Sequence, residues 1–289
     1  MSPAATLRSA LAGGACLPAP GVFDGLSALL AEQAGFRLAF VSGAGISFAR
    51  HGRPDMGLVT ASELADTVAL MRERVGLPLL VDMDTGFGNA LNVQRTVRVL
   101  ERSGASALQM EDQLSPKRCG HMAGKQVIAA EEMVGKIHAA LDARHDANTL
   151  IIARTDALGV NGFDDALERA QRYLEAGADG LFIEAPKTLA QMQSIAARFA
   201  TDIPLVHNLV EGGGSPVMSA DGLADLGYRL ALFPVALLHL FVPQAQALLA
   251  HIREHGSTAS RGDLIDLSRI NEILGASALL KDSARYGSP

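Results

Sequence analysis

Two carboxylates two residues apart, Asp82 and Asp84, stand at the end of an apolar run in "LPLLVDMDTG". If this run is a strand, both side chains leave it on the same face, because successive side chains alternate. Carboxylates that close repel each other unless a proton or a cation lies between them. With Glu111, which ends the next apolar run, they suit Mg2+ or Mn2+, ions that prefer oxygen ligands. The alternative is that each acid caps a helix or pairs with an arginine.

An arginine and two glycines are candidates for binding an anion beside these acids. Arg154 ends the run "TLIIARTDA", and its planar guanidinium can bind a carboxylate through two parallel hydrogen bonds. Gly43 and Gly45 would let backbone N–H groups approach an anion closely. The structural alternatives are an ion pair of Arg154 with Glu184 or Asp82, and a tight turn at the glycines.

The most unusual segment is "SPKRCGHMAGKQ" (115–126), which combines basic residues, a cysteine, glycines and a histidine with almost nothing apolar. Cys119 and His121 have no second pair at ligand spacing, so a structural zinc site is disfavoured. The segment is then a solvated surface loop or a mobile lid. In the lid interpretation, Lys117, Arg118 and His121 surround an anionic substrate and tune the acidity of the Cys119 thiol.

Short apolar runs recur along the chain, each followed by polar or glycine-rich residues. Runs of this length are typical of strands buried on both faces, and helical patterns lie between them. About eight such units predict a closed (β/α)8 barrel, an α/β fold. An open doubly wound sheet is the alternative, although no GxGxxG follows the first strand to indicate dinucleotide binding. The predicted strands are 15–20, 37–45, 77–86, 105–113, 149–157, 180–186, 203–209 and 228–235.

A barrel of this kind has its active site at the C-terminal ends of the strands. The acids, Arg154 and the glycines all fall at predicted strand ends, as do Ser42, Glu184 and Asn208. The 115–126 segment follows the fourth strand, in a loop of roughly 15 residues, which is long for such a connection. The barrel therefore brings carboxylates, an arginine and the candidate lid to one rim.

Composition limits the class of protein. The chain has 289 residues and a net charge of −6, and no Lys/Arg cluster indicates nucleic-acid binding. We see no signal peptide and no apolar stretch long enough to span a membrane, and therefore expect a cytoplasmic protein. Two cysteines make no disulfide framework, and Cys16 is expected to be a small buried residue in the first strand.

Two helical segments are predicted after the last strand, over about 236–254 and 263–280. A barrel needs only one helix there. The second helix could pack on its own barrel or on that of a neighbouring subunit. We expect a single barrel domain over 1–289 that includes a helical extension at about 255–289.

Four motifs together resemble the isocitrate lyase/phosphoenolpyruvate mutase superfamily: "VDMDTGFGNALNVQRTV", "EDQLSPKRCGH", "EEMVGKI" and "IIARTDA". Within it, the sequence is most similar to short lyases of the 2-methylisocitrate lyase and 2,3-dimethylmalate lyase type. The K-R-C-G-H motif marks the carbon–carbon lyases. The resemblance implies a barrel with Mg2+, a small anionic 2-hydroxy or 2-oxo acid as substrate, and a homotetramer whose neighbours exchange the last helix.

The resemblance also implies a role for each residue at the rim. The metal cluster, with direct contact expected from Asp82, maps to Asp55, Asp82, Asp84 and Glu111. The substrate pocket maps to Ser42, Gly43, Ala44, Asp82, Lys117, Arg154, Glu184 and Asn208. The catalytic set maps to Cys119 as the proton-donating thiol, with Glu111, Arg118, His121 and Arg154.

The implied reaction cleaves a 2-hydroxy di- or tricarboxylate to pyruvate and a carboxylate, with Cys119 protonating the carbanion. Three positions depart from the 2-methylisocitrate lyases. Gln109 stands in place of a histidine, Phe40 in place of a tyrosine, and His239 in place of an arginine. These changes favour a smaller dicarboxylate, such as 2,3-dimethylmalate or another 2-alkylmalate.

Other functions are weighed against this one. Hydrolysis or decarboxylation of oxaloacetate would use the same metal and oxo-acid pocket. Phosphonate formation, of the carboxyvinyl-carboxyphosphonate phosphorylmutase type, is opposed by the K-R-C-G-H motif. A non-catalytic binding barrel is opposed by the intact acids, arginine and thiol.

Overall fold

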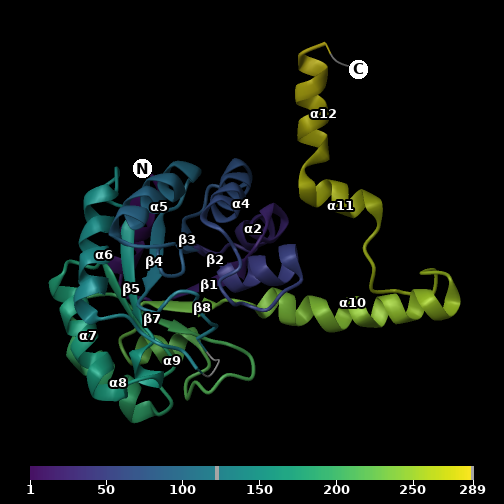
Figure 1. Cartoon of the computed structure of the whole chain (residues 1–289). Coiled ribbons are helices and arrows are strands. Elements are labelled where there is room, and N and C mark those ends of the chain that lie inside the picture. The colour runs from purple at the N-terminus through teal and green to yellow at the C-terminus, as the bar shows by residue number, and fades with distance from the viewer. Residues whose placement is uncertain (121–123, 288–289) are drawn as a thin grey trace. The chain divides into compact units, whose positions relative to one another are not determined.

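The computed structural model describes residues 1–120 and 124–287. The chain forms two compact units, Met1–Leu240 and Phe241–Pro289. The first unit holds every strand among the described residues, and the second holds helices (Figure 1). The site therefore depends on the first unit, and each unit is described by itself.

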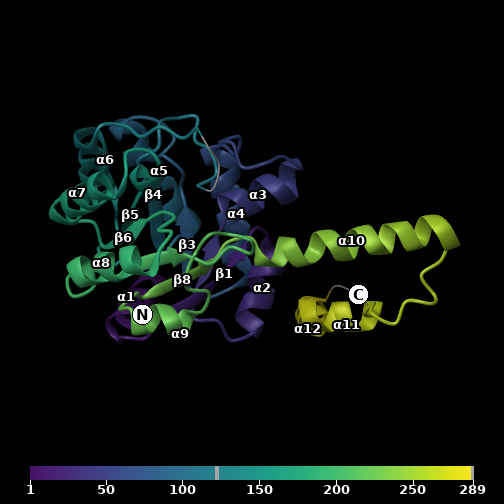
Figure 2. The ribbon, with the colours of Figure 1, turned by 90° about the horizontal axis from the view of Figure 1, so that it is seen from below.

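Eight parallel strands form a closed barrel in chain order, with β8 pairing back to β1 (Figure 1, Figure 2). This confirms the predicted (β/α)8 fold and excludes the open sheet. The register places Asp82 beside Gln109 and Glu111 beside Arg154. The strands are β1 (Leu17–Val22), β2 (Ala39–Val41), β3 (Leu79–Asp82), β4 (Ala107–Glu111), β5 (Leu150–Thr155), β6 (Gly180–Ile183), β7 (Leu205–Asn208) and β8 (Leu230–Phe233).

Helices connect the strands and lie outside the barrel (Figure 2). A π-helical turn, Ser47–His51, follows α3, and a 3-10 turn, Ala157–Gly159, follows β5. Glycine ends several helices: Gly104, after α5, has a φ of 106°. The helices of this unit are α1 (Pro3–Ala12), α2 (Gly25–Gln33), α3 (Gly43–Ile46), α4 (Ala61–Arg74), α5 (Ala90–Ser103), α6 (Ala130–Ala143), α7 (Phe163–Glu175), α8 (Leu189–Phe199) and α9 (Ala220–Asp225).

An apolar core fills the barrel near the starts of the strands. Leu17, Leu150 and Leu230, which begin β1, β5 and β8, belong to one buried cluster. Leu7 and Leu11 of α1 join that cluster, so α1 packs against the end of the barrel where the strands begin. Polar side chains are therefore left to the opposite rim.

The second unit departs from the sequence prediction. The helix α10 (Ala236–His255) agrees with the first predicted segment and crosses from one unit into the other. The second predicted segment, 263–280, is two helices, α11 (Leu267–Leu274) and α12 (Ala276–Arg285). Gly275 separates them because its φ of 80° is left-handed, a conformation that ends a helix. No described helix is long and apolar enough to cross a membrane.

Candidate active site

A cavity of about 170 Å3 lies at the C-terminal ends of the strands, where the sequence placed the site. Two predicted residues do not line it but lie beside its wall. A Cβ on Gly43 would lie 3.3 Å from Oδ2 of Asp82, and Asp84 pairs with a lining lysine. His121 lies outside the described residues. The predicted residues that line the cavity are Ser42, Ala44, Asp55, Asp82, Glu111, Lys117, Arg118, Cys119, Arg154, Glu184 and Asn208.

Lys117 lies inside the carboxylate cluster. Its Nζ is 2.6 Å from Oδ1 of Asp55 and 2.8 Å from Oδ1 of Asp84, and its side chain is 5% exposed. Burial would lower the pKa of Lys117, but the surrounding carboxylates, first Asp84 and Asp82, raise it well above its usual value. The lysine is therefore a fixed positive charge at this wall of the cavity.

The cluster holds more acid than the lysine can neutralise. Burial raises the pKa of Asp84 to about 7, and the charges of Asp82 and Asp55 add to this against the opposing effect of Lys117. Burial also raises the pKa of Glu111 well above its usual value. Oε1 of Glu111 is buried and has no hydrogen-bond partner among the described residues. A further cation would satisfy both features.

The donor set decides which kind of cation fits. The described residues contain no group of three or more His, Cys, Asp or Glu side chains arranged to hold a metal directly. Zinc in a protein site takes mostly direct protein ligands, whereas Mg2+ keeps several waters and uses one or two carboxylates. The carboxylates at this wall, with the unpartnered oxygen of Glu111, fit a hydrated Mg2+.

Arg154 also lines the cavity and is held by three carboxylates. Its Nε and Nη2 donate to Asp156 at 2.9 and 3.2 Å. Glu111 lies 3.2 Å from Nε, and Glu184 lies 3.7 Å from Nη2. The pair with Glu184, given above as a structural alternative, is thus present, but Asp156 makes the closest contacts. A guanidinium has five N–H donors, so Arg154 keeps further donors for a ligand carboxylate.

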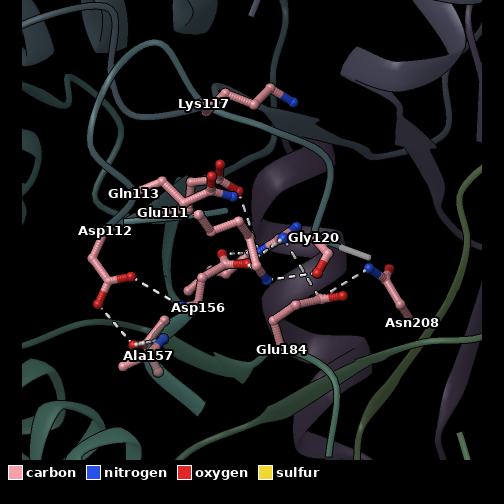
Figure 3. Close-up of polar contacts among 12 residues, drawn as sticks. Glu111, Asp112, Gln113, Lys117, Gly120, Asp156, Ala157, Glu184 and Asn208 are labelled. Atoms are coloured by element: carbon pink, nitrogen blue, oxygen red, sulfur yellow. Dashed lines mark hydrogen bonds and ion pairs between the residues drawn. The ribbon is translucent and has the colours of Figure 1, made fainter. Parts of the chain in front are cut away.

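A second layer of hydrogen bonds fixes this arginine. Asp112 accepts from the backbone N–H of Asp156 at 2.9 Å and from the Thr155 hydroxyl at 2.7 Å. From α7, the Tyr173 hydroxyl donates to Asp112 at 2.7 Å, and Arg169 donates at 3.2 Å. Figure 3 shows Asp112 on one side of Asp156, with Glu184 and Asn208 on the other. Asp156 is therefore held through Asp112 by residues of β5 and α7.

The loop between β4 and α6 carries the K-R-C-G motif onto the cavity. Gln113 accepts from the Arg118 N–H at 3.0 Å and donates to the Arg118 carbonyl at 2.8 Å. The Cys119 N–H donates to the Asp55 carbonyl at 3.2 Å. Because Lys117 is buried and Cys119 lines the cavity, this part of the loop is not a solvated excursion.

The other cysteine has no such position. Cys16 directly precedes β1 instead of lying within it, and it is partly buried. Burial raises the pKa of its thiol to about 11, so the thiolate is scarce at neutral pH. Cys119 is the cysteine at the site.

Strained backbone borders the site. Asp84, Phe87 and Ala185 are non-glycine residues with φ values of 49°, 58° and 58°. Such conformations cost about 1–3 kcal/mol each and are retained where the surrounding structure enforces them. Asp84 lies two residues after Asp82 of β3, and Ala185 directly follows Glu184, so two of these conformations occur beside acids that line the cavity.

The three positions at which the sequence departs from the 2-methylisocitrate lyases also lie at or near the site. Phe40 and His239 line the cavity, and His239 lies 3.1 Å from Glu211. Gln109 is 1% exposed on β4, and neither amide atom has a hydrogen-bond partner among the described residues. Asp156, which directly follows β5, was not among the predicted site residues. Lys125 was not predicted either, because only the composition of its segment pointed to it.

The fold and the site define an α/β-barrel enzyme with an acidic, arginine-containing pocket and a pocket cysteine. The family model described as phosphoenolpyruvate phosphomutase matches residues 7–253. The chain belongs to the phosphoenolpyruvate mutase/isocitrate lyase superfamily, which confirms the resemblance inferred from its motifs.

Two curated relatives cover most of the chain. A 2-methylisocitrate lyase of Aeropyrum pernix is 46% identical over 86% of this chain and 78% of its own length. A 2,3-dimethylmalate lyase of Eubacterium barkeri is 38% identical over 100% of this chain and 99% of its own length. These relatives are carbon–carbon lyases, in agreement with the predicted class of enzyme.

Solved structures match the chain along its whole length. An oxaloacetate acetylhydrolase bound to 3,3-difluorooxalacetate has a TM-score of 0.94 and 32% identity, and the match covers 100% of this chain and 98% of that one. A 2,3-dimethylmalate lyase has the same score and identity, with 100% and 96% covered. A phosphonopyruvate hydrolase with oxalate and Mg2+ has a TM-score of 0.89 and 32% identity, with 99% of both chains covered.

Proposed function

We propose that this protein is a Mg2+-dependent lyase that cleaves a 2-hydroxy di- or tricarboxylate to pyruvate and a second carboxylate. The observation that carries the proposal is a single cavity lined by Asp82, Glu111, Arg154 and Cys119. An ion-binding wall, a carboxylate-binding arginine and a proton-donating thiol are the three groups that such a cleavage needs. The lyases among the relatives support the same reaction.

Different residues of the protein would bind the substrate, hold the ion and donate the proton. Arg154 binds the carboxylate of the substrate through the N–H donors that Asp156 leaves available. The carboxylates of the Asp82 wall (Asp55, Asp82, Asp84 and Lys117), with Glu111, would hold the ion, which when bound favours the ionised form of the substrate hydroxyl. The hydroxyl proton passes to solvent, which returns a proton to Cys119 after the products leave. As the C–C bond breaks, the electron pair of that bond stays on the departing fragment and the hydroxyl carbon becomes a carbonyl. Cys119 donates its S–H proton to that fragment, and the loop from residue 113 to 127 acts as the lid that excludes water.

Two lining residues favour a substrate smaller than 2-methylisocitrate. Phe40 offers no hydroxyl to the cavity, and His239 is already in contact with Glu211. A third carboxylate would therefore lack an arginine partner at this position. We infer a dicarboxylate of the 2,3-dimethylmalate or 2-alkylmalate type.

Hydrolysis or decarboxylation of oxaloacetate is the second candidate. The observation that favours it is the match to oxaloacetate acetylhydrolase, which equals the match to 2,3-dimethylmalate lyase in TM-score and identity. Decarboxylation needs the ion and the oxo-acid pocket but has less need of a thiol. A phosphonate-forming reaction is less favoured because the K-R-C-G-H motif is present.

A coupled assay of pyruvate release over a substrate panel separates these functions. The panel contains 2-methylisocitrate, isocitrate, 2,3-dimethylmalate, citramalate and oxaloacetate, each with Mg2+, with Mn2+ and with EDTA. We expect the highest kcat/KM on an alkylmalate and no turnover in EDTA. Turnover of oxaloacetate alone would support the second candidate. Failure to bind both Mg2+ and oxalate in calorimetry would indicate a non-catalytic barrel.

We also propose that the protein is a homotetramer whose subunits exchange the last helix. The helices α11 and α12 contain no buried residue, so the Phe241–Pro289 unit has almost no core of its own. Apolar side chains such as Leu267, Leu279 and Leu280 need a partner surface. Light scattering should give four subunits for the full chain, and Leu279→Glu with Leu280→Glu should lower that number. A monomeric full chain would refute the exchange.

A further inference from the structure

Lys125 contacts both the backbone beside Cys119 and the carboxylate that holds Arg154. It has no role in the mechanism above. It belongs to the β4–α6 loop, and its side chain is 7% exposed. Its Nζ donates to the carbonyl of Gly120 at 2.5 Å and to Oδ1 of Asp156 at 2.7 Å. One contact fixes the residue next to Cys119, and the other reaches the carboxylate that holds Arg154.

The Asp156 end of this connection is rigid. Asp156 is fully buried, its backbone N–H is bound by Asp112, and its carboxylate binds Nε and Nη2 of Arg154. Burial would raise the pKa of Asp156, but Arg154 and Lys125 together keep it below its usual value. The carboxylate is thus an ionised, immobile anchor for the lysine.

The Gly120 end lies directly against the substrate-binding groups (Figure 3). A Cβ on Gly120 would lie 2.4 Å from Nη2 of Arg154 and 2.8 Å from Oε1 of Glu184. This backbone can approach so closely only because the residue is glycine. A small shift of the Gly120 carbonyl would therefore change how far Cys119 lies from a ligand on Arg154.

We propose that Lys125 is a positioning residue that sets the Cys119 thiol relative to the substrate carboxylate bound by Arg154. This inference rests on the proposed function, in which Cys119 donates the proton. A charged, two-donor side chain is needed because it must satisfy a neutral carbonyl and a buried carboxylate at once. Lysine buried in this way is costly unless both partners are present.

The consequence for turnover is specific. General acid catalysis contributes about 10²–10⁴-fold, and it depends on the distance between donor and acceptor. Lys125→Met should therefore lower kcat by about 10–100-fold. Asp112 and Glu111 still hold the Arg154 side of the pocket, so KM should change by less than about threefold, since substrate binding is retained.

The test compares three variants. Lys125→Met removes both contacts, and Lys125→Arg keeps a charge that can reach both partners and should recover most of kcat. Lys187→Met is the matched control, because Lys187 lines the neighbouring cavity with Lys125 but is exposed and has no contact with Gly120 or Asp156 among the described residues. Circular dichroism and thermal unfolding check that each variant folds, and Lys125→Gln replaces the methionine variant where it does not.

A second readout does not depend on turnover. The rate at which iodoacetamide alkylates Cys119 is followed by mass spectrometry of the Cys119 peptide. This rate depends on the accessibility and the acidity of the thiol, and therefore on its position. We expect Lys125→Met to change this rate by at least about threefold and the other two variants to leave it near that of the wild type. An unchanged alkylation rate with unchanged kcat, or a rise in KM alone, would overturn the positioning role. A wild type that cleaves no hydroxy acid, yet shows the altered alkylation in Lys125→Met, would instead refute only the proposed reaction.

Discussion

The two walls of the cavity are built on opposite plans. The Arg154 wall (Arg154, Asp156 and Asp112) consists of charges whose partners come from the chain itself, on β5, on α7 and directly after β4. The Asp82 wall (Asp55, Asp82, Asp84 and Lys117) has three acids and one lysine, and the pKa of Asp84 is raised to about 7. The Arg154 wall, whose charges are paired within the chain, keeps a fixed geometry. The Asp82 wall, which has more acids than cations, is suited to bind a cation.

The largest effect that would test this difference is expected at the Arg154 wall. Arg154→Gln leaves Glu111 and Glu184 buried without this cation, and Asp156 keeps only its contact with Lys125. Breaking a buried pair in this way costs about 3–5 kcal/mol of unfolding free energy, which urea unfolding measures. Activity should fall by roughly a thousandfold as a substrate-binding donor is lost.

Arg154→Lys is the control for this change. It keeps the charge but not the planar pair of donors, so most of the stability should return while most of the activity stays lost. Equal loss of stability in both variants would mean that the arginine acts through packing alone.

At the Asp82 wall we expect a substitution to weaken ion binding without lowering the unfolding free energy. Asp84→Asn should weaken Mg2+ binding by about 10–100-fold in calorimetry, as loss of an outer ligand contact does. It should not lower the unfolding free energy without Mg2+, because burial and the repulsion from Asp82 and Asp55 disfavour the charge of Asp84 by more than its contact with Lys117 favours it. Asp66→Asn, on the exposed face of α4, is the control. A destabilised variant with wild-type Mg2+ affinity would contradict the contrast between the walls.

The same acid predicts a pH dependence. The pKa of Asp84 is about 7 in the folded protein and 3.8 as the ordinary value, so the folded state binds the extra proton between these pH values. Stability contributed by this group therefore falls as pH rises from about 4 to about 7. Urea unfolding in EDTA should show that the unfolding free energy of Asp84→Asn rises relative to that of the wild type over that pH range. A constant difference between the two proteins would show that Asp84 is not strained by its neighbours.

The smallest effect is expected behind Arg154. Tyr173→Phe removes one of the hydrogen bonds that Oδ2 of Asp112 accepts, and Thr155 and Arg169 still donate to this oxygen. It should cost about 1–2 kcal/mol of unfolding free energy and change kcat by less than about threefold. Tyr228→Phe is the matched control, because its buried hydroxyl has no hydrogen-bond partner among the described residues. Tyr228→Phe should leave the unfolding free energy unchanged or raise it. An equal loss of unfolding free energy in both variants would show that the hydrogen bond from Tyr173 to Asp112 does not stabilise the protein.

The sequence predicted the strands and the rim because both follow from local patterns. Apolar runs mark strands buried on both faces, and the residues after them must meet at one end of a parallel barrel. This reasoning placed Asp82, Glu111 and Arg154 correctly at the rim. It could not show that Lys117 points into the acids or that Lys125 reaches Asp156, because these contacts depend on how a long loop folds back.

The same limit explains the error at the end of the chain. Periodicity continued through residues 263–280, and a single left-handed glycine, Gly275, divided the helix. Glycine inside a helical pattern is tolerated in many helices, so its presence did not predict the break.

In the proposed mechanism, carbon–carbon cleavage depends on a proton from Cys119. The direct measurement is pyruvate release by wild type and Cys119→Ser on the best substrate of the panel, with Mg2+ present and oxalate binding as the check on the pocket. We predict that the serine variant binds oxalate with the affinity of the wild type and loses cleavage by about 10²–10⁴-fold, the contribution of a general acid. Cleavage of the hydroxy acid at the wild-type rate by Cys119→Ser would contradict the account.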